Sequence, residues 1–212
     1  ADHAGDQDGV DDLDDVGGGG MLAGFRILLG SRYLQGICLL ILLYSGASTF
    51  LYFTQAHIVA AEMADGAQRT RLFALIDLAV NVLTVGAQLF ATNRIAARFG
   101  LSTTLALIPA LLIAGFLILG FAPVLSVLVV VQVLRRAGNY AVMKAAREML
   151  FTVLTPTQKY KAKNLVDTLV YRGGDAVSGW LYAGMRAIGL DTGAIALAAV
   201  PLCGVWLFTG LR

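Results

Sequence analysis

The residues best suited to binding chemistry lie between positions 135 and 175, where basic side chains recur within apolar sequence. Eight basic residues are opposed by three acids, Glu148, Asp167 and Asp175, so this segment has a net charge of +5. A cavity lined by such residues attracts an anion, because a low-dielectric interior strengthens the attraction between charges. Phosphate groups suit both the arginine fork and the lysine ammonium group. The eight basic residues are Arg135, Arg136, Lys144, Arg147, Lys159, Lys161, Lys163 and Arg172.

The spacing of these residues places many of them on common helix faces, because steps of three or four residues return to the same face. Two such faces occur, and each mixes charged groups with tyrosine, which either stacks on a base or packs against its neighbours. The first holds Arg135, Arg136, Asn139, Tyr140, Lys144, Arg147 and Glu148, and the second holds Asn164, Asp167 or Thr168, Tyr171, Asp175 and Ser178.

Two further polar stripes occur earlier in the chain at the same helical spacing. Hydrogen bonds between helices, which only hold a bundle together, are an alternative explanation for every stripe. Ionised groups are costly in a membrane, so a wet cavity explains the stripes beyond residue 135 better. The earlier stripes are Tyr44, Ser48, Tyr52 and Gln55, and Asp77, Asn81, Thr84 and Gln88.

Local alternatives remain for three features of this region. The lysines at 159, 161 and 163 either bind an anion or are ordinary cytoplasmic charges on a wet loop. Two glycines at 173 and 174 permit a close helix approach or a helix break. Arg172 and Asp175 are three residues apart and suited to pairing with each other. Arg135 and Arg136 lie about 18 Å into the membrane by the helix rise, which favours a functional role.

The elements that must position these residues are long apolar helices. Apolar residues make up 58% of the 212 residues, charged residues make up 14%, and the mean hydropathy is +0.74. Soluble domains contain about 25% charged residues. A bilayer core of about 30 Å needs about 20 helical residues, and six stretches meet this need. The sequence predicts an all-α integral membrane protein with a six-helix bundle over residues 26–212, and its spans are 34–56, 72–92, 103–121, 123–154, 164–188 and 194–211.

Residues 1–25 differ in composition from the rest of the chain. The first 16 residues hold seven of the 14 acids and no Lys or Arg, and four glycines follow at 17–20. Such a segment buries too little apolar surface to fold, which predicts a disordered cytoplasmic linker. It lacks the basic start and apolar centre of a signal peptide. We expect this linker to join the bundle to a preceding part of a longer protein.

Lysine and arginine near the span ends predict the orientation, because they are enriched on the cytoplasmic side of membrane proteins. Eight of them fall on the side of the linker and three on the other side, which places the linker and the C-terminus in the cytoplasm. The sequence has no targeting segment, which favours a bacterial inner membrane. The eight are Arg26, Arg32, Arg94, Arg98, Lys159, Lys161, Lys163 and Arg212, and the three are Arg69, Arg71 and Arg186.

Other kinds of chemistry lack their residue patterns in this sequence. There is no C-x-x-C, H-E-x-x-H, G-x-S-x-G or Walker-type string, so neither a metal site nor a hydrolase is predicted. Cys38 and Cys203 lie in apolar runs and are expected to pack as small hydrophobic residues. We expect no enzymatic activity, no cofactor and no nucleic-acid partner.

Three strings between residues 147 and 175 resemble one family of carriers. They are REMLF at 147–151, KYKAKNLVD at 159–167 and YRGGD at 171–175. They are similar to the ATP:ADP antiporter (nucleotide transporter) family of plastids and intracellular bacteria. That family reads approximately K-E-M, then K-x-K-G-K-x-x-[IV]-D, then a glycine-rich segment. The sequence departs from this pattern at Arg147, at Ala162, and at Asp175, where transporting members tend to have lysine.

The resemblance implies a twelve-span carrier of the major facilitator type that exchanges nucleotides. This chain would be its C-terminal six-span half, and each half of that architecture contains two inverted three-helix repeats. The resemblance also implies a role in transport for a lysine of the K-x-K-G-K string, here Lys161 or Lys163. The loop 93–100 resembles the basic loop of that superfamily at Arg98 and Gly100.

The sequence thus predicts a secondary carrier of a nucleotide or similar phosphorylated anion, which works by alternating access against an N-terminal six-span half. One alternative is a facilitator-type carrier for another organic anion or a drug, and another is a non-transporting membrane sensor or scaffold. The candidate substrate-binding residues are Arg135, Arg136, Asn139, Tyr140, Lys144, Arg147, Lys161, Lys163 and Arg172. The candidate gating or pairing residues are Asp77, Glu148, Lys159, Asp167 and Asp175. If the carrier is a proton symporter, we expect Asp77, Asp167 or Asp175 to be the proton site.

Overall fold

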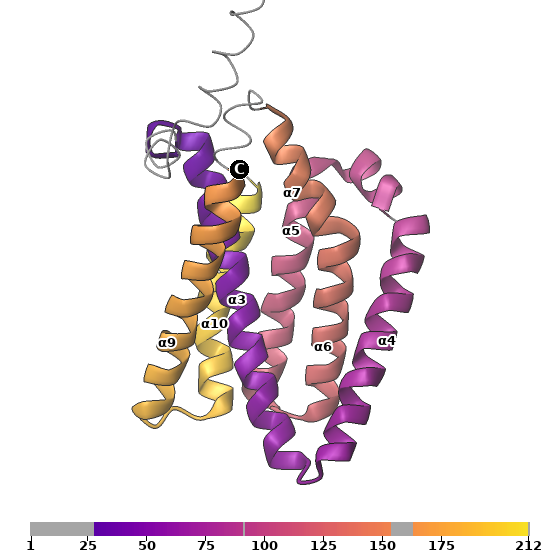
Figure 1. Ribbon diagram of the computed structural model, residues 1–212, viewed down its shortest axis with the longest axis vertical. Helices are drawn as coiled ribbons and strands as arrows, with labels where there is room; N and C mark the ends of the chain where they lie inside the picture. Colours follow the sequence, from indigo (N-terminus) through magenta and orange to yellow (C-terminus); the bar gives the residue numbers. More distant parts are fainter. Residues whose placement is uncertain (1–27, 91, 154–162, 212) are drawn as a thin grey trace, which may run out of the picture.

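The computed structural model describes residues 28–90, 92–153 and 163–211, and every regular element in these ranges is a helix. The predicted linker, residues 1–25, lies outside the described part of the chain. The longer helices stand side by side in one bundle (Figure 1). In chain order the elements are α3 (Arg32–Glu62), α4 (Gly66–Phe90), α5 (Thr92–Phe121), α6 (Leu125–Gly138), the π-helix η1 (Asn139–Met143), α7 (Lys144–Leu150), the 3-10 turn η2 (Phe151–Val153), the π-helix η3 (Val166–Val170), α9 (Tyr171–Ala187) and α10 (Thr192–Leu211).

Within the described ranges five helices are long and apolar enough to cross a membrane, which confirms the prediction of an all-helical membrane protein. Their bounds are Arg32–Glu62, Gly66–Phe90, Ser102–Phe121, Leu125–Val153 and Thr192–Leu211. The predicted span 164–188 is helical but is not among the five. Five of the six predicted spans are thus long and apolar enough among the described residues, and the remaining one is not, because four charged side chains lower the hydropathy of its helix. They are Asp167, Arg172, Asp175 and Arg186.

Helix α3 occupies a central place in the bundle, and it packs against both α9 and α10. Helix α10 packs along α5, α5 contacts α6, and α6 contacts α4, so that α9 and α4 lie at opposite edges (Figure 1). The core contains the enclosed side chains of Trp206, Phe116 and Phe151. The start of α3 and the end of α10 lie at the same end of the bundle, together with the end of α7.

Specific side chains and glycines fix several helix boundaries. Ser31 Oγ accepts a backbone N–H of the first turn of α3, and Asp191 Oδ1 accepts one at the start of α10, at 2.7 Å. Both are preferred helix-capping residues. Gly189, with φ of +88°, lies in the turn between α9 and α10, and Gly100, with φ of +77°, bends the first part of α5 away from the span. Only glycine adopts these φ values without strain.

Two π-helical turns lie beside the polar residues of the bundle. In η1 the N–H of Lys144 donates to the carbonyl of Asn139, and in η3 the N–H of Tyr171 donates to the carbonyl of Val166. Each bond spans five residues instead of four, so each turn holds one extra residue. Such turns occur frequently at functional sites.

Helix α9 runs without a break through Gly173 and Gly174. The alternative of a helix break at these glycines is therefore wrong, and close packing is seen at Gly174, whereas nothing lies within 4 Å of a Cβ atom on Gly173. A Cβ atom on Gly174 would lie 3.1 Å from Ser45 Oγ. The glycine thus lets α9 approach α3 closely at the level of Ser45.

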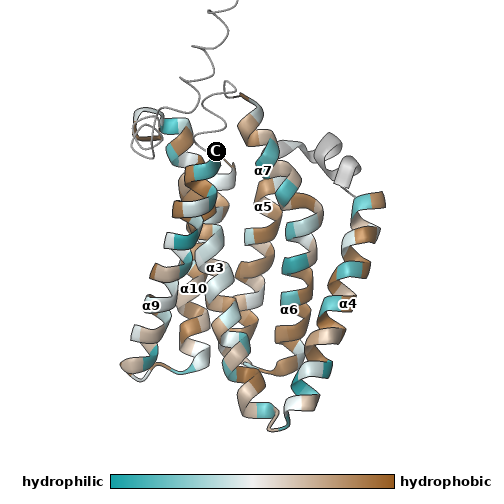
Figure 2. Cartoon of the chain, viewed as in Figure 1, coloured by the Kyte–Doolittle hydropathy of each residue, from teal (hydrophilic) through white to brown (hydrophobic). Residues whose placement is uncertain are grey.

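The outer faces of α4 and α9 are apolar. Leu78, Val82, Val177 and Trp180 are exposed there, with Trp180 83% exposed. Hydrophilic residues instead lie part-way along α4 and α6 (Figure 2). Exposed apolar faces around polar residues at mid-bundle suit a lipid environment better than water.

Candidate ligand-binding site

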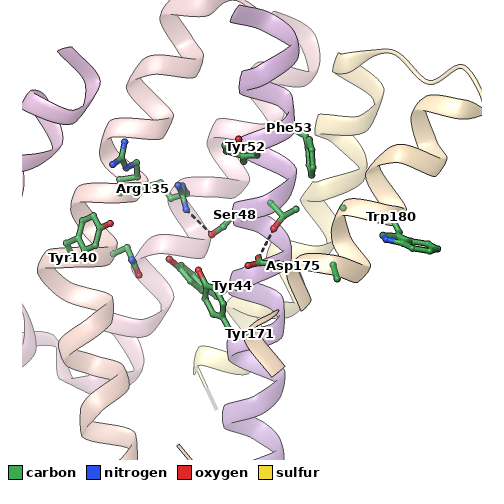
Figure 3. A pocket seen from close by; sticks show the side chains of 14 residues that line it. Tyr44, Ser48, Tyr52, Phe53, Arg135, Tyr140, Tyr171, Asp175 and Trp180 are labelled. Carbon is green, nitrogen blue, oxygen red and sulfur yellow. Dashed lines mark hydrogen bonds between the residues drawn. The ribbon is translucent and has the colours of Figure 1, made fainter. Parts of the chain in front are cut away.

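A polar cavity of about 770 Å³ opens between α3, α6, η1 and α9 (Figure 3). Three of the predicted polar stripes, on α3, on α6 with η1 and on α9, contribute to its wall. The third contribution comes from α9, whose close contact with α3 fixes the position of its acid. The polar lining residues are Tyr44, Ser48, Thr49 and Tyr52 from α3, Arg135, Arg136, Asn139 and Tyr140 from α6 and η1, and Tyr171 and Asp175 from α9.

A second, smaller cavity of about 310 Å³ adjoins the first. The two cavities share Tyr44, Asn139, Tyr140 and Tyr171 in their walls. The smaller one extends to the cationic residues Lys144 and Arg147, with Asp167 opposite them. The two cavities therefore form a continuous polar surface with a cationic end.

Arg135 is the only charged residue among the buried side chains of the described residues, with 9% of its surface exposed. Its Nη1 donates to Ser48 Oγ at 2.8 Å (Figure 3). Its Nε donates to Gln132 Oε1 at 3.1 Å. Gln132 in turn donates to Gln55. Among the described residues no carboxylate forms an ion pair with Arg135. A guanidinium held only by neutral partners keeps its full charge available to an anion.

Asp175 lies on the α9 wall of the larger cavity and is held from α3. Its Oδ1 accepts a hydrogen bond from Ser45 Oγ at 2.6 Å and another from Thr49 Oγ1 at 2.8 Å. The predicted pairing of Asp175 with Arg172 is wrong, because the carboxylate turns to these hydroxyl groups and Arg172 is exposed. No ion pair involves Asp175 within the described ranges. The close approach of α9 at Gly174 brings the carboxylate within reach of both hydroxyls.

Three of the other predicted basic residues are paired with acids. Arg136 Nη1 lies 2.6 Å from Asp77 Oδ1, which joins α6 to α4. Arg147 Nη2 lies 3.7 Å from Asp167 Oδ1, and Lys163 Nζ lies 2.8 Å from a carboxylate oxygen of Glu148. The predicted pairing role of these three acids is thus seen in the structure. Much of the positive charge of this region is neutralised locally.

Aromatic side chains stiffen the wall that the two cavities share. The rings of Tyr44 and Tyr171 lie 6.1 Å apart, and Tyr44 also contacts the enclosed Trp206 edge-to-face at 5.7 Å. Phe53 stacks on Tyr182 at 5.1 Å behind the larger cavity. Contacts of this kind fix ring orientation, so these tyrosines present preformed surfaces to a ligand.

The structure brings together most of the predicted site. Five predicted residues line the larger cavity, and three more line the smaller one. Lys163 and Arg172 line neither cavity. Lys159 and Lys161 lie outside the described residues. The larger cavity contains Arg135, Arg136, Asn139, Tyr140 and Asp175. The smaller cavity adds Lys144, Arg147 and Asp167, and it shares Asn139 and Tyr140 with the larger one.

Sequence analysis missed part of this site. Tyr44, Ser48 and Tyr52 stood out as a polar stripe but were not named as candidate site residues. Ser45 and Thr49, which hold Asp175, were not noticed at all. Their signal is the unusual density of hydroxyl groups within one helical turn of an apolar span.

The chemistry of the site follows from these residues alone, because no family model, no curated protein and no solved structure matches the chain. The described residues contain no group of three or more His, Cys, Asp and Glu side chains arranged to hold a metal ion. The arrangement suits reversible binding of a charged ligand: one buried cation, one oriented carboxylate and several aromatic rings.

Proposed function

We propose that this chain is the C-terminal half of a secondary transporter that carries or exchanges nucleotides such as ATP and ADP, or a related phosphorylated anion. The observation that carries the proposal is the buried guanidinium of Arg135, which has only neutral partners and opens on a cavity of about 770 Å³. A charge at membrane depth is costly, and such charges mark substrate pathways in membrane proteins.

In this proposal the phosphates of the ligand contact Arg135 and then Lys144 in the adjoining smaller cavity. Neither residue forms an ion pair among the described residues, so both offer unneutralised positive charge. The rings of Tyr44, Tyr140 and Tyr171 line both cavities and contact the sugar or the base.

The architecture of the whole transporter is inferred from the polar face that remains exposed on this bundle. Asp77 of α4, Tyr52 of α3 and Tyr140 of η1 are all exposed in the middle of long apolar helices. Lipid is a poor partner for such a face. In the proposal an N-terminal six-span half covers this face and completes the cavity. Helix α9 is then the sixth span of the C-terminal half that this chain forms, and rocking of the two halves gives alternating access.

The resemblance of residues 147–175 to nucleotide antiporters supports the same proposal. In this proposal the membrane is a bacterial inner membrane and both ends of this chain lie in the cytoplasm, an orientation supported by the excess of Lys and Arg at one end of the predicted spans. The start of α3 and the end of α10 lie at one end of the bundle, which is compatible with this orientation.

A second candidate function is a facilitator-type carrier for another organic anion or a drug. Asp175 is the observation that favours it, because a carboxylate in the cavity weakens the attraction for a highly charged anion. The two candidates differ in whether nucleotides are transported at all.

The test is uptake of labelled ATP by vesicles that contain the full-length protein, either preloaded with ADP or empty. We expect uptake only into preloaded vesicles if the protein is an exchanger, and into both if it is a proton symporter. Lys144→Gln removes a cation from the smaller cavity and should raise KM by about tenfold or more, the worth of one charged hydrogen bond. Arg172→Gln is the matched control, because Arg172 is exposed and lines neither cavity.

Absence of ATP uptake by correctly folded protein, in both kinds of vesicle, would reject the nucleotide proposal. Uptake that responds equally to Lys144→Gln and Arg172→Gln would remove the two cavities from the proposed pathway.

A further inference from the structure

The larger cavity holds one positive and one negative group that no described residue neutralises. Of its three charged lining residues, Arg136 is paired with Asp77 at 2.6 Å, whereas Arg135 and Asp175 form no ion pair among the described residues. The cavity is therefore not simply cationic. It presents a guanidinium on the α6 wall and a carboxylate on the α9 wall.

Hydroxyl groups of α3 hold these two charges in place. Ser48 accepts from Arg135, while Ser45 and Thr49 donate to Asp175. These three hydroxyls lie within about 6 Å along the helix axis, by the rise of 1.5 Å per residue. The two charges thus lie at similar depth on either side of α3 (Figure 3).

Each charged group keeps one atom for a ligand. Asp175 receives both hydroxyl hydrogen bonds on Oδ1, and Oδ2 has no hydrogen-bond partner among the described residues. Arg135 uses Nε and Nη1, and Nη2 has no partner in the same part of the chain. Neither atom belongs to the fully enclosed, unpartnered polar atoms of the described residues, and both side chains line the cavity.

The surroundings give the cavity a direction. Lys144, which forms no ion pair among the described residues, lines the smaller cavity together with the shared tyrosines, whereas Arg147 in that cavity is paired with Asp167. The aromatic residues Phe53 and Trp180 line the larger cavity together with Asp175. Because Lys144 lines only the smaller cavity and Asp175 only the larger one, an elongated ligand with a phosphate end and an aromatic end is best matched with its aromatic end beside the carboxylate.

We infer that the transported nucleotide carries an exocyclic amino group on its base, and that this amino group donates a hydrogen bond to Oδ2 of Asp175. This inference rests on the proposed nucleotide transport and adds the class of base. A carboxylate is acceptor-only when ionised, so it binds an amino group and rejects a base that presents hydrogen or oxygen at that position. The phosphates then occupy the end of Arg135 and Lys144.

The test compares equilibrium binding of three probes to the full-length protein in lipid nanodiscs: ADP, purine riboside diphosphate and adenosine. Purine riboside diphosphate differs from ADP only in having hydrogen in place of the amino group. We expect ADP to bind about tenfold or more tightly than this analogue, as is usual for a hydrogen bond to a charged group. Adenosine, which lacks the phosphates, should bind more weakly than both.

Substitutions of Asp175 test whether this residue causes the preference for ADP over purine riboside diphosphate. In Asp175→Ala the preference for ADP over the analogue should disappear, and in Asp175→Asn it should fall several-fold, because the amide is a neutral acceptor. Asp191→Asn is the matched control: Asp191 caps α10 outside the cavity, asparagine caps a helix equally well, and the preference should stay at the wild-type value.

Equal binding of ADP and the analogue to the wild-type protein would overturn this inference and leave nucleotide transport standing. A preference that survives Asp175→Ala would overturn it as well. Binding of neither nucleotide would refute the nucleotide proposal itself, and this inference with it. The comparison of probes on the unaltered protein gives a result even if an Asp175 variant fails to fold.

Discussion

Replacement of Arg135 by glutamine should abolish tight substrate binding with little effect on stability. The neutral amide removes a charge whose burial at membrane depth costs about 2.5–3.5 kcal/mol. It also weakens the hydrogen bonds to Ser48 and Gln132, from about 1.5–3 kcal/mol each for a charged donor to about 0.5–1.5 kcal/mol for a neutral one. That loss is about 2–3 kcal/mol in total, so the free energy of unfolding should change by about 1 kcal/mol or less.

The effect on the ligand has no such compensation. The lost contact is a charged hydrogen bond to a phosphate oxygen, and its removal should weaken binding by about 10- to 150-fold. Arg135→Lys should lose most of this affinity as well, because an ammonium group lacks the fork that contacts Ser48, Gln132 and a ligand at the same time.

The assay combines the apparent melting midpoint of the purified protein with the Kd for ADP. We expect the midpoint of Arg135→Gln to stay within about 4 °C of the wild type. Arg186→Gln is the control, because Arg186 is exposed in the last turn of α9, outside both cavities. This substitution should change neither the melting midpoint nor the Kd for ADP. A large fall in the midpoint with an unchanged Kd would refute the reasoning, since Arg135 would then be a structural residue only.

Two further predictions concern the framework of the site. Asp77→Asn removes the partner of Arg136 and should lower the melting midpoint, while the double variant Asp77→Asn with Arg136→Gln should recover most of the loss. Thermal unfolding of the wild type, the two single variants and the double variant should give a coupling energy of about 0.5 kcal/mol or more. Strictly additive effects of the two substitutions would contradict the ion pair. Gly174→Leu should lower stability by about 1–3 kcal/mol and weaken ADP binding, because its Cβ meets Ser45 Oγ at 3.1 Å and moves α9 away from α3. Gly184→Leu has nothing within 4 Å of its Cβ and should be near neutral in both measurements, and an equal loss in the two variants would contradict this packing argument.

The bounds of the apolar helices were largely predictable, because bilayer thickness imposes a length that composition reveals. The predicted span 103–121 compares with Ser102–Phe121, and 194–211 compares with Thr192–Leu211. The fifth predicted span shows the limit of this approach. Asp167 and Asp175 serve the two cavities and the contacts with neighbouring helices, and together with Arg172 and Arg186 they reduce the hydropathy of this helix below that of the other spans.

The pairing of charges was beyond sequence reasoning. Asp77 and Arg136 are 59 positions apart, and only the packing of α4 against α6 brings them together. The sequence showed an excess of positive charge, yet it did not indicate which cations remain unpaired. That distinction between Arg135 and Arg136 depends on the rotation of α6, which one residue along a helix changes by about 100°.

The extra residue in each π-helical turn sets the register of the site. In an uninterrupted α-helix the residue one turn after Asn139 is the apolar Met143, but η1 places Lys144 there. One turn after Val166, η3 places Tyr171 where Val170 would otherwise follow. If the same sequence formed an uninterrupted α-helix through 139–143, α7 and its cations would be rotated by about 100° without the loss of any charge. Deletion of one residue within 139–143 would instead turn η1 into an α-helical turn and keep Lys144 one turn after Asn139. The π-helical turns therefore decide which side chains face the cavities, in addition to the identity of the charged residues.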